Sequence, residues 1–112
     1  MDTSPIDLPT FTELQEAMGA DFALELVETF CEEAPTILAE LRRAVGASDA
    51  DAYRRAAHSL KSNGQTFGAL TLAAMARDAE LGGMPAEPAP VLDALDAEYA
   101  AAAAALQELA RG

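Results

Sequence analysis

The chain has 112 residues, which is enough for one domain and too few for two. It carries 19 acidic against 7 basic residues, and a net charge of −12 argues against nucleic acid and anionic membranes as partners. Hydrophobic residues make up 51% and aromatics only 5%, because much of the apolar content is helix-favouring alanine. Alternating strand patterns are absent, so we expect an all-α fold.

The N-terminal third predicts a short helix after a leader. Residues 1–9, with Pro5 and Pro9, are expected to form a loose leader. The short helix is expected over residues 10–18, capped by Thr10 or Thr12 and ended by Gly19.

A longer helix is expected from Asp21, as its N-cap, to Gly46. Pro35 removes one backbone donor inside it. Because the apolar stripe stays in phase across Pro35, we expect a kink in one helix rather than the start of a second. The stripe that predicts its buried face consists of Phe22, Leu26, Val27, Phe30, Ala34, Ile37, Leu38, Leu41 and Val45.

The second half predicts three further helices. Ser48 or Asp49 is expected to cap a helix that runs to Phe67 and ends at Gly68. Residues 70–81 form the next helix, residues 84–90 a proline-rich loop, and residues 91–110 the last helix. Short connections between these elements predict an antiparallel four-helix bundle with a short extra N-terminal helix, as one domain over residues 1–112.

Neither a signal peptide nor a membrane span is visible, and the longest apolar tract, residues 100–106, falls far short of the roughly 20 residues that a span needs. We therefore expect a cytoplasmic protein. Cys31 lies in an apolar helical pattern and is expected to be a reduced core residue.

Five of the seven cations fall within one twenty-residue stretch: Arg42, Arg43, Arg54, Arg55 and Lys61. A positive patch on an acidic chain can mark the place where an anion is handled. The alternative is ordinary ion pairing on solvated helix faces. Charge alone leaves both interpretations open.

His58 is the only histidine, and it lies within this basic stretch. With 3.6 residues per turn, His58 shares a helix face with Lys61, Ser62 and Gln65, whereas Leu60 and Phe67 fall on the opposite face. The pattern therefore predicts an exposed histidine rather than a core one. An exposed imidazole is largely neutral near pH 7 and can act as a nucleophile.

The neighbours of His58 suit a bound phosphoryl group. Lys61 lies one turn away and could stabilise an anion on the imidazole, while Ser62 and Gln65 could donate hydrogen bonds to a phosphoryl oxygen. Gly64 costs about 1 kcal/mol in a helix interior, so we expect a neighbouring helix to approach it closely.

The residues that other kinds of catalytic or metal site would need are absent from the sequence. The chain has no second histidine, no Cys–His pair, no glycine-rich phosphate loop and no serine with a base beside it. One histidine with scattered carboxylates does not have metal-ligand spacing. The sequence thus predicts a protein that holds a phosphoryl group but does not generate one, with no metal and no cofactor of its own.

At these residues the sequence resembles the histidine phosphotransfer (HPt) domain family. The resemblance covers roughly residues 20–83, including the stretches 30–35 and 72–81. Its central residues are His58, Leu60, Lys61, Ser62, Gly64, Gly68 and Ala69. One departure is Ser62-Asn63, where many members have Gly and Ser.

The resemblance implies a phosphocarrier that exchanges a phosphoryl group between His58 and the aspartate of a receiver domain. The high negative charge of the chain favours a monomer. The partners would be a response-regulator receiver, a hybrid histidine kinase or both, and Mg²⁺ would be held by the receiver. It implies that Lys61 stabilises the phosphoryl group and that the small Ser62 and Ala69 leave room for the partner. The residues expected to dock the partner are Arg54, Arg55, Ala69, Phe11, Leu14 and Met18. For Phe11, Leu14 and Met18 the alternative is simple packing on the bundle.

Two other functions were weighed. A helical adaptor would bind a signalling partner without phosphorylation, and its affinity would not depend on His58. A metal-dependent helical enzyme would need ligands that the sequence does not supply.

Overall fold

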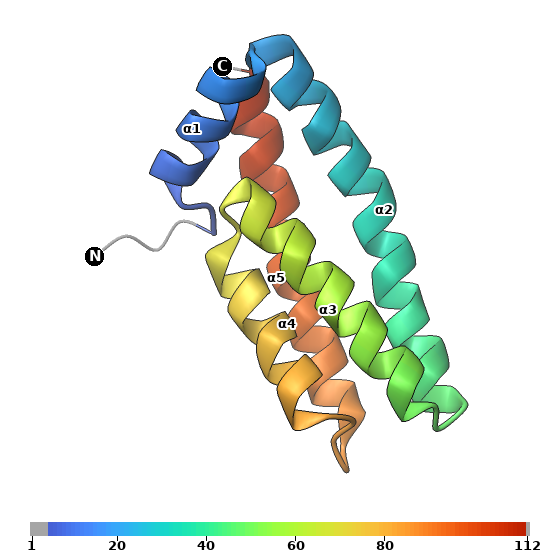
Figure 1. The fold of residues 1–112 in the computed structure, drawn as a ribbon. Helices are drawn as coiled ribbons and strands as arrows, with labels where there is room; N and C mark the ends of the chain where they lie inside the picture. The colour runs from blue at the N-terminus through green and yellow to red at the C-terminus, as the bar shows by residue number, and fades with distance from the viewer. Residues whose placement is uncertain (1–4, 112) are drawn as a thin grey trace.

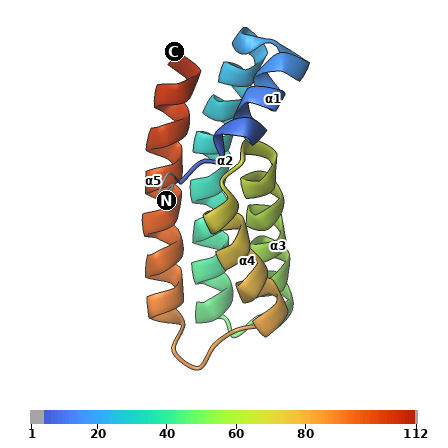
Figure 2. The same ribbon diagram turned by 90° about the vertical axis from the view of Figure 1, so that its left-hand side faces the viewer.

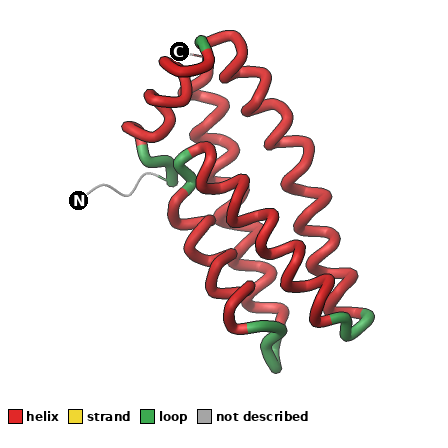
Figure 3. The backbone as a smooth tube through the Cα atoms, viewed as in Figure 1, coloured by secondary structure: helices red, strands yellow, loops and turns green. Residues whose placement is uncertain are grey.

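The computed structural model describes residues 5–111, and over these residues helices are the only regular secondary structure, with no strand. The five helices are joined by short loops at their ends (Figures 1 and 3). They are α1 (Leu8–Met18), α2 (Ala20–Gly46), α3 (Ala50–Phe67), α4 (Leu70–Gly82) and α5 (Pro88–Arg111). No helix within residues 5–111 is long and apolar enough to cross a membrane.

The N-terminal segment is held against the domain, so the predicted leader is wrong from Ile6 onward. Ile6 is buried in the core, and the Asp7 carboxylate accepts from the Thr10 backbone N–H at 3.3 Å, which caps α1 at Leu8. The cap is therefore Asp7, not Thr10 or Thr12, and Pro9 stands in the first turn, where proline is tolerated. Residues 1–4 of the leader lie outside the described residues.

Helix α2 continues through Pro35, as the unbroken apolar stripe predicts. A proline at position 35 leaves the carbonyl of Cys31, four residues earlier, without its helical donor. The Tyr99 hydroxyl of α5 donates to that carbonyl at 3.1 Å. Burial raises the pKa of Tyr99 to about 12, so the hydroxyl keeps the proton that it donates. Cys31 itself is half-buried rather than deep in the core.

Three expected boundaries or contacts differ in the structure. Asp21 lies in the first turn of α2 instead of capping it, because Gly19 precedes the helix with a φ of 87°. Phe22 is exposed, and Ala23 takes its place in the core. The predicted loop over residues 84–90 is shorter, because Pro88 and Pro90 begin α5, where a missing backbone donor costs nothing.

Helix α3 packs mainly against α2 and α4, and Figures 1 and 2 show α4 lying alongside α3. Asp49, one of the two predicted caps, accepts from the Ala52 backbone N–H at 3.0 Å. Gly64 allows the close helix approach that its cost predicts, since a Cβ there would lie 3.2 Å from the Cβ of Ala73. The side chains of Tyr53, Leu60 and Phe67 are buried on the inner face of α3.

The turn between α3 and α4 is fixed by the N-terminal segment. Gly68 has a φ of 78°, and a Cβ at this position would lie 2.8 Å from the Asp7 carbonyl. The Asp7 backbone N–H in turn donates to the Gly68 carbonyl at 2.7 Å. Both the left-handed conformation and the contact require glycine. Residues 5–7 thereby fix the end of the helix that carries His58.

Candidate functional site

His58 lies on the exposed face of α3, as its spacing from Leu60 and Phe67 predicts. Its side chain is 56% exposed, whereas Leu60 is buried. The imidazole is not free on this surface, because its Nδ1 lies 2.8 Å from Oε2 of Glu80 on α4. One ring nitrogen is thus held by the protein, and Nε2 is the nitrogen left for a reacting group.

Glu80 joins the histidine to the predicted lysine. Its other oxygen, Oε1, lies 2.8 Å from Nζ of Lys61. The Glu80 side chain is 18% exposed and that of Lys61 is 21% exposed, so both are more sheltered than the histidine. The Lys61 ammonium, and secondarily the hydrogen bond from His58, lowers the pKa of the Glu80 carboxyl, which is therefore ionised at neutral pH.

The charge on Glu80 determines where the histidine proton resides. An ionised carboxylate only accepts hydrogen bonds, so Nδ1 of a neutral His58 must donate to it. The proton then sits on Nδ1, and Nε2 carries a lone pair. The arrangement presents a nucleophilic nitrogen to solvent at a fixed orientation.

Glu80 was absent from the residues singled out in the sequence, although a signal for it existed. The helix pair α3–α4 turns at Gly68 and Ala69. His58 lies ten residues before Gly68 and Glu80 eleven residues after Ala69. Residues at equal or nearly equal distances from the turn of an antiparallel helix pair face each other. The same register places Gly64 opposite Ala73, and each of them is four residues from the turn.

The remaining predicted side chains of the α3 face are exposed. Ser62 and Gln65, which follow His58 on α3, are exposed to solvent. Arg54 and Arg55, which precede His58 on α3, are also exposed. The Arg54 guanidinium donates to the Asp51 carboxylate at 3.0 Å. Arg54 therefore forms the ordinary ion pair on a solvated helix face that was the alternative to an anion site.

The predicted docking residues divide into buried and exposed ones. Phe11 is 1% exposed and packs into the core, and Ala69 is 0% exposed at the start of α4, so both docking predictions are wrong. Phe11 lies on the inner face of α1, and Ala69 is covered where α3 meets α4. Leu14 is half-buried and Met18 is 51% exposed, so they remain accessible.

Among residues 5–111, no group of three or more His, Cys, Asp or Glu side chains is placed to hold a metal ion. The ionisable cluster around His58 consists of one imidazole, one carboxylate and one ammonium.

Comparison with protein-family models identifies the family of the chain. The model described as the Hpt domain matches residues 25–110, which include the whole of α3 and α4. The chain belongs to the Hpt domain family. Hpt domains serve in histidine phosphotransfer within phosphorelays, and they are phosphocarriers rather than enzymes with catalytic sites of their own.

A solved structure agrees with this assignment. The crystal structure of histidine-containing phosphotransfer protein B (HptB) from Pseudomonas aeruginosa PAO1 superimposes with a TM-score of 0.88 at 25% sequence identity. The match covers 98% of this chain and 97% of that one. A comparison with curated protein sequences gives no match.

Proposed function

We propose that His58 is the phosphorylated residue of this Hpt domain and that it exchanges a phosphoryl group with the aspartate of a receiver domain. The observation that carries the proposal is the hydrogen bond between Nδ1 of His58 and the sheltered carboxylate of Glu80. It leaves Nε2 exposed and unprotonated on the only histidine of the chain.

The chemistry follows from that arrangement. The lone pair of Nε2 attacks the phosphorus of an aspartyl phosphate, an N–P bond forms, and the P–O bond to the aspartate breaks. The departing carboxylate keeps the electron pair. As the imidazole gives up electron density, its Nδ1–H side becomes positive, and the Glu80 carboxylate stabilises this charge, as a buried aspartate does for a catalytic histidine. The reverse transfer uses the same contacts.

Lys61 supports this exchange through Glu80. Its ammonium pairs with Oε1, which leaves Oε2 directed at His58 and offsets the carboxylate charge that an incoming phosphoryl group would meet. Since Lys61 is also one turn from His58, we propose that it is the nearest cation for the bound phosphoryl oxygens. Ser62 and Gln65 are proposed to donate hydrogen bonds to them from the same face.

The partner is proposed to cover the exposed side of α3, with Met18 and Leu14 of α1 as apolar contacts and Arg54 and Arg55 as polar ones. The helices α2 to α5, joined by short connections, would form the antiparallel four-helix bundle that presents this face. We expect this domain to act as a monomer with receiver domains and hybrid kinases as its partners.

The test is transfer from a phosphorylated receiver domain in the presence of Mg²⁺, with wild type and His58→Gln in parallel. Wild type should take up an acid-labile, alkali-stable label, and His58→Gln should take up none while its helicity and thermal melting stay unchanged. Label on the folded His58→Gln protein would contradict the proposal, because another residue would then be the acceptor.

A further inference from the structure

The charges of Lys61 and Glu80 cancel each other beside His58. The Lys61 ammonium lies 2.8 Å from Oε1 of Glu80, and this oxygen is buried. Moving the ammonium away would leave a buried carboxylate oxygen without its partner, so Lys61 stays with Glu80. The ammonium can still donate to a phosphoryl group on Nε2 of His58. That group, however, adds about two negative charges, which a neutral ion pair does not offset.

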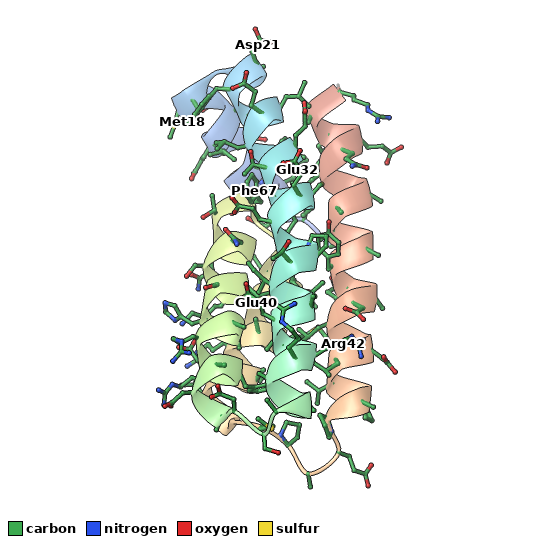
Figure 4. All side chains as sticks on the ribbon, turned by 90° about the vertical axis from the view of Figure 1, so that its right-hand side faces the viewer. Met18, Asp21, Glu32, Glu40, Arg42 and Phe67 are labelled. Carbon is green, nitrogen blue, oxygen red and sulfur yellow. The ribbon has the colours of Figure 1, made fainter. Side chains whose placement is uncertain are left out.

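Three of the other cations lie on α2 and α5, away from the seam between α3 and α4. Arg42 pairs with Asp93 of α5 at 3.2 Å, and Figure 4 shows it on the side of α2 toward α5. Arg43 lines a groove between α2 and α3. Arg111 is the last residue of α5, a helix that packs mainly against α2 and α4.

The two arginines of α3 are also directed away from a group on His58. Arg54 pairs with Asp51 at 3.0 Å. Because helical side chains lean toward the N-terminus of their helix, Arg54, four residues before His58, leans away from the imidazole. Arg55 lines the groove toward α2.

Arg77 is the remaining cation, and it lies at the outer edge of the α4 face that meets α3. Ala73 and Glu80 both contact α3. Arg77 comes four residues after Ala73 and three before Glu80, so the helix period places all three on one face. Ala76, at the inner edge of this face, is buried, whereas Arg77 is exposed. Arg77 is therefore on the outer side of the seam, as the exposed histidine is.

Arg77 is also at nearly the same level of the helix pair as His58. Arg77 is eight residues after Ala69, and Leu60 is eight residues before Gly68, so these two positions are opposite each other. His58 is two residues from Leu60, which is about 3 Å along the helix axis. Helices in contact lie about 8–10 Å apart. A phosphoryl group on the outer side of His58 is thus within reach of the long side chain of Arg77.

The Arg77 guanidinium has no ion pair among residues 5–111, although the chain has 19 acidic residues against 7 basic ones. Glu80, one turn away, is paired with Lys61 instead. An unpaired guanidinium presents its donors in a planar fork that matches the oxygens of a phosphoryl group.

We infer that Arg77 binds the phosphoryl group of phosphorylated His58, as a second cation beside Lys61. The inference rests on the proposed function, and it assigns Arg77 to the phosphorylated state rather than to docking of the partner. Lys61 approaches the phosphoryl group from α3 and Arg77 approaches it from α4. Arg77 adds the net positive charge that the pair of Lys61 and Glu80 lacks.

The experiment separates binding of the phosphoryl group from docking of the partner. Label transfer is measured in both directions between His58 and the purified receiver domain that labels wild type fastest. The ratio of the two kcat/KM values gives the equilibrium constant, and a residue that only docks the receiver changes both values alike. Arg77→Ala removes the cation and Arg77→Lys keeps its charge. Arg111→Ala is the matched control, because it changes the net charge equally at the end of α5.

Arg77→Ala should shift the equilibrium about 3-fold to 5-fold away from phosphorylated His58, as expected for the loss of an exposed ion pair. The shift should shrink at high salt, and Arg77→Lys should recover most of it. Arg111→Ala should stay within about 1.5-fold of wild type. An unchanged equilibrium constant in Arg77→Ala, even with slower transfer, would overturn the inference, and so would an equal shift in Arg111→Ala. If no receiver labels wild type, the proposed function fails and the inference fails with it.

Discussion

The two sides of α3 are built differently, although His58 lies between them. On the α4 side, Gly64 packs closely against Ala73, and Glu80 is shared by His58 and Lys61. On the α2 side, an open groove of 400 Å³ is lined by two arginines and two carboxylates, Arg43, Arg55, Glu40 and Asp49. The packed side orients the imidazole of His58 through Glu80, whereas the lining of the groove does not include His58. The orientation of His58 therefore depends on the contacts of α3 with α4 rather than on those with α2.

The largest expected effect comes from disturbing the packed side. Gly64→Leu should lower the free energy of unfolding by about 1–3 kcal/mol or more, because its side chain would enter space already held by Ala73 and the Ala69 carbonyl. Urea denaturation measures the loss. Gly46→Leu is the matched control, since a Cβ at Gly46 meets nothing within 4 Å. Equal stability of the two variants would show that close packing of α3 against α4 does not require glycine at position 64.

The next effect concerns the carboxylate on the same side. Glu80→Gln keeps the shape of the side chain but loses the charge that stabilises His58 as the N–P bond forms. Transfer from a phosphorylated receiver should slow about 10-fold to 100-fold, as expected for the loss of a hydrogen bond to a charged group. Glu108→Gln, at an exposed position on α5, should react like wild type. An unchanged rate for Glu80→Gln would exclude Glu80 from the reaction.

The smallest effect is on acid stability. Lys61, and then His58, lowers the pKa of Glu80 in the folded state below the unfolded value of about 4.3. Unfolding raises that pKa, so the contribution to stability is present above the unfolded value and is lost as the pH falls through the lower folded value. The difference in stability between wild type and Glu80→Gln should therefore be larger at pH 6 than at pH 3. A difference that grows toward pH 3 would contradict the direction of the shift.

Much of the exposed face around His58 could be predicted from the sequence, because this face depends on one helix alone. The 3.6-residue repeat separates His58 from Leu60 and Phe67, and the cost of Gly64 indicates a close neighbour. The position of Glu80 opposite His58 depends on the register between α3 and α4, and the 3.6-residue period of one helix does not predict that register. It becomes visible only when residues are counted outward from the Gly68–Ala69 turn.

The exposure of the apolar residues of α1 was less predictable for a similar reason. Phe11, Leu14 and Met18 all look apolar along the chain, and only the packing of α1 decides which of them is covered. Asp7 begins the helix earlier than expected and the segment before it binds the α3–α4 turn, so Phe11 is directed into the core and Met18 remains exposed. Burial of Ala69 follows from the same turn.

The central claim is that Glu80 fixes the proton of His58 on Nδ1 and leaves Nε2 as the nucleophile. The most direct measurement is a long-range ¹H–¹⁵N correlation spectrum of the imidazole at a pH where it is neutral, which is simple to interpret because the chain has a single histidine. Wild type should show a protonated Nδ1 and an unprotonated Nε2, and Glu80→Gln should lose that preference. A proton on Nε2 in wild type would contradict the account.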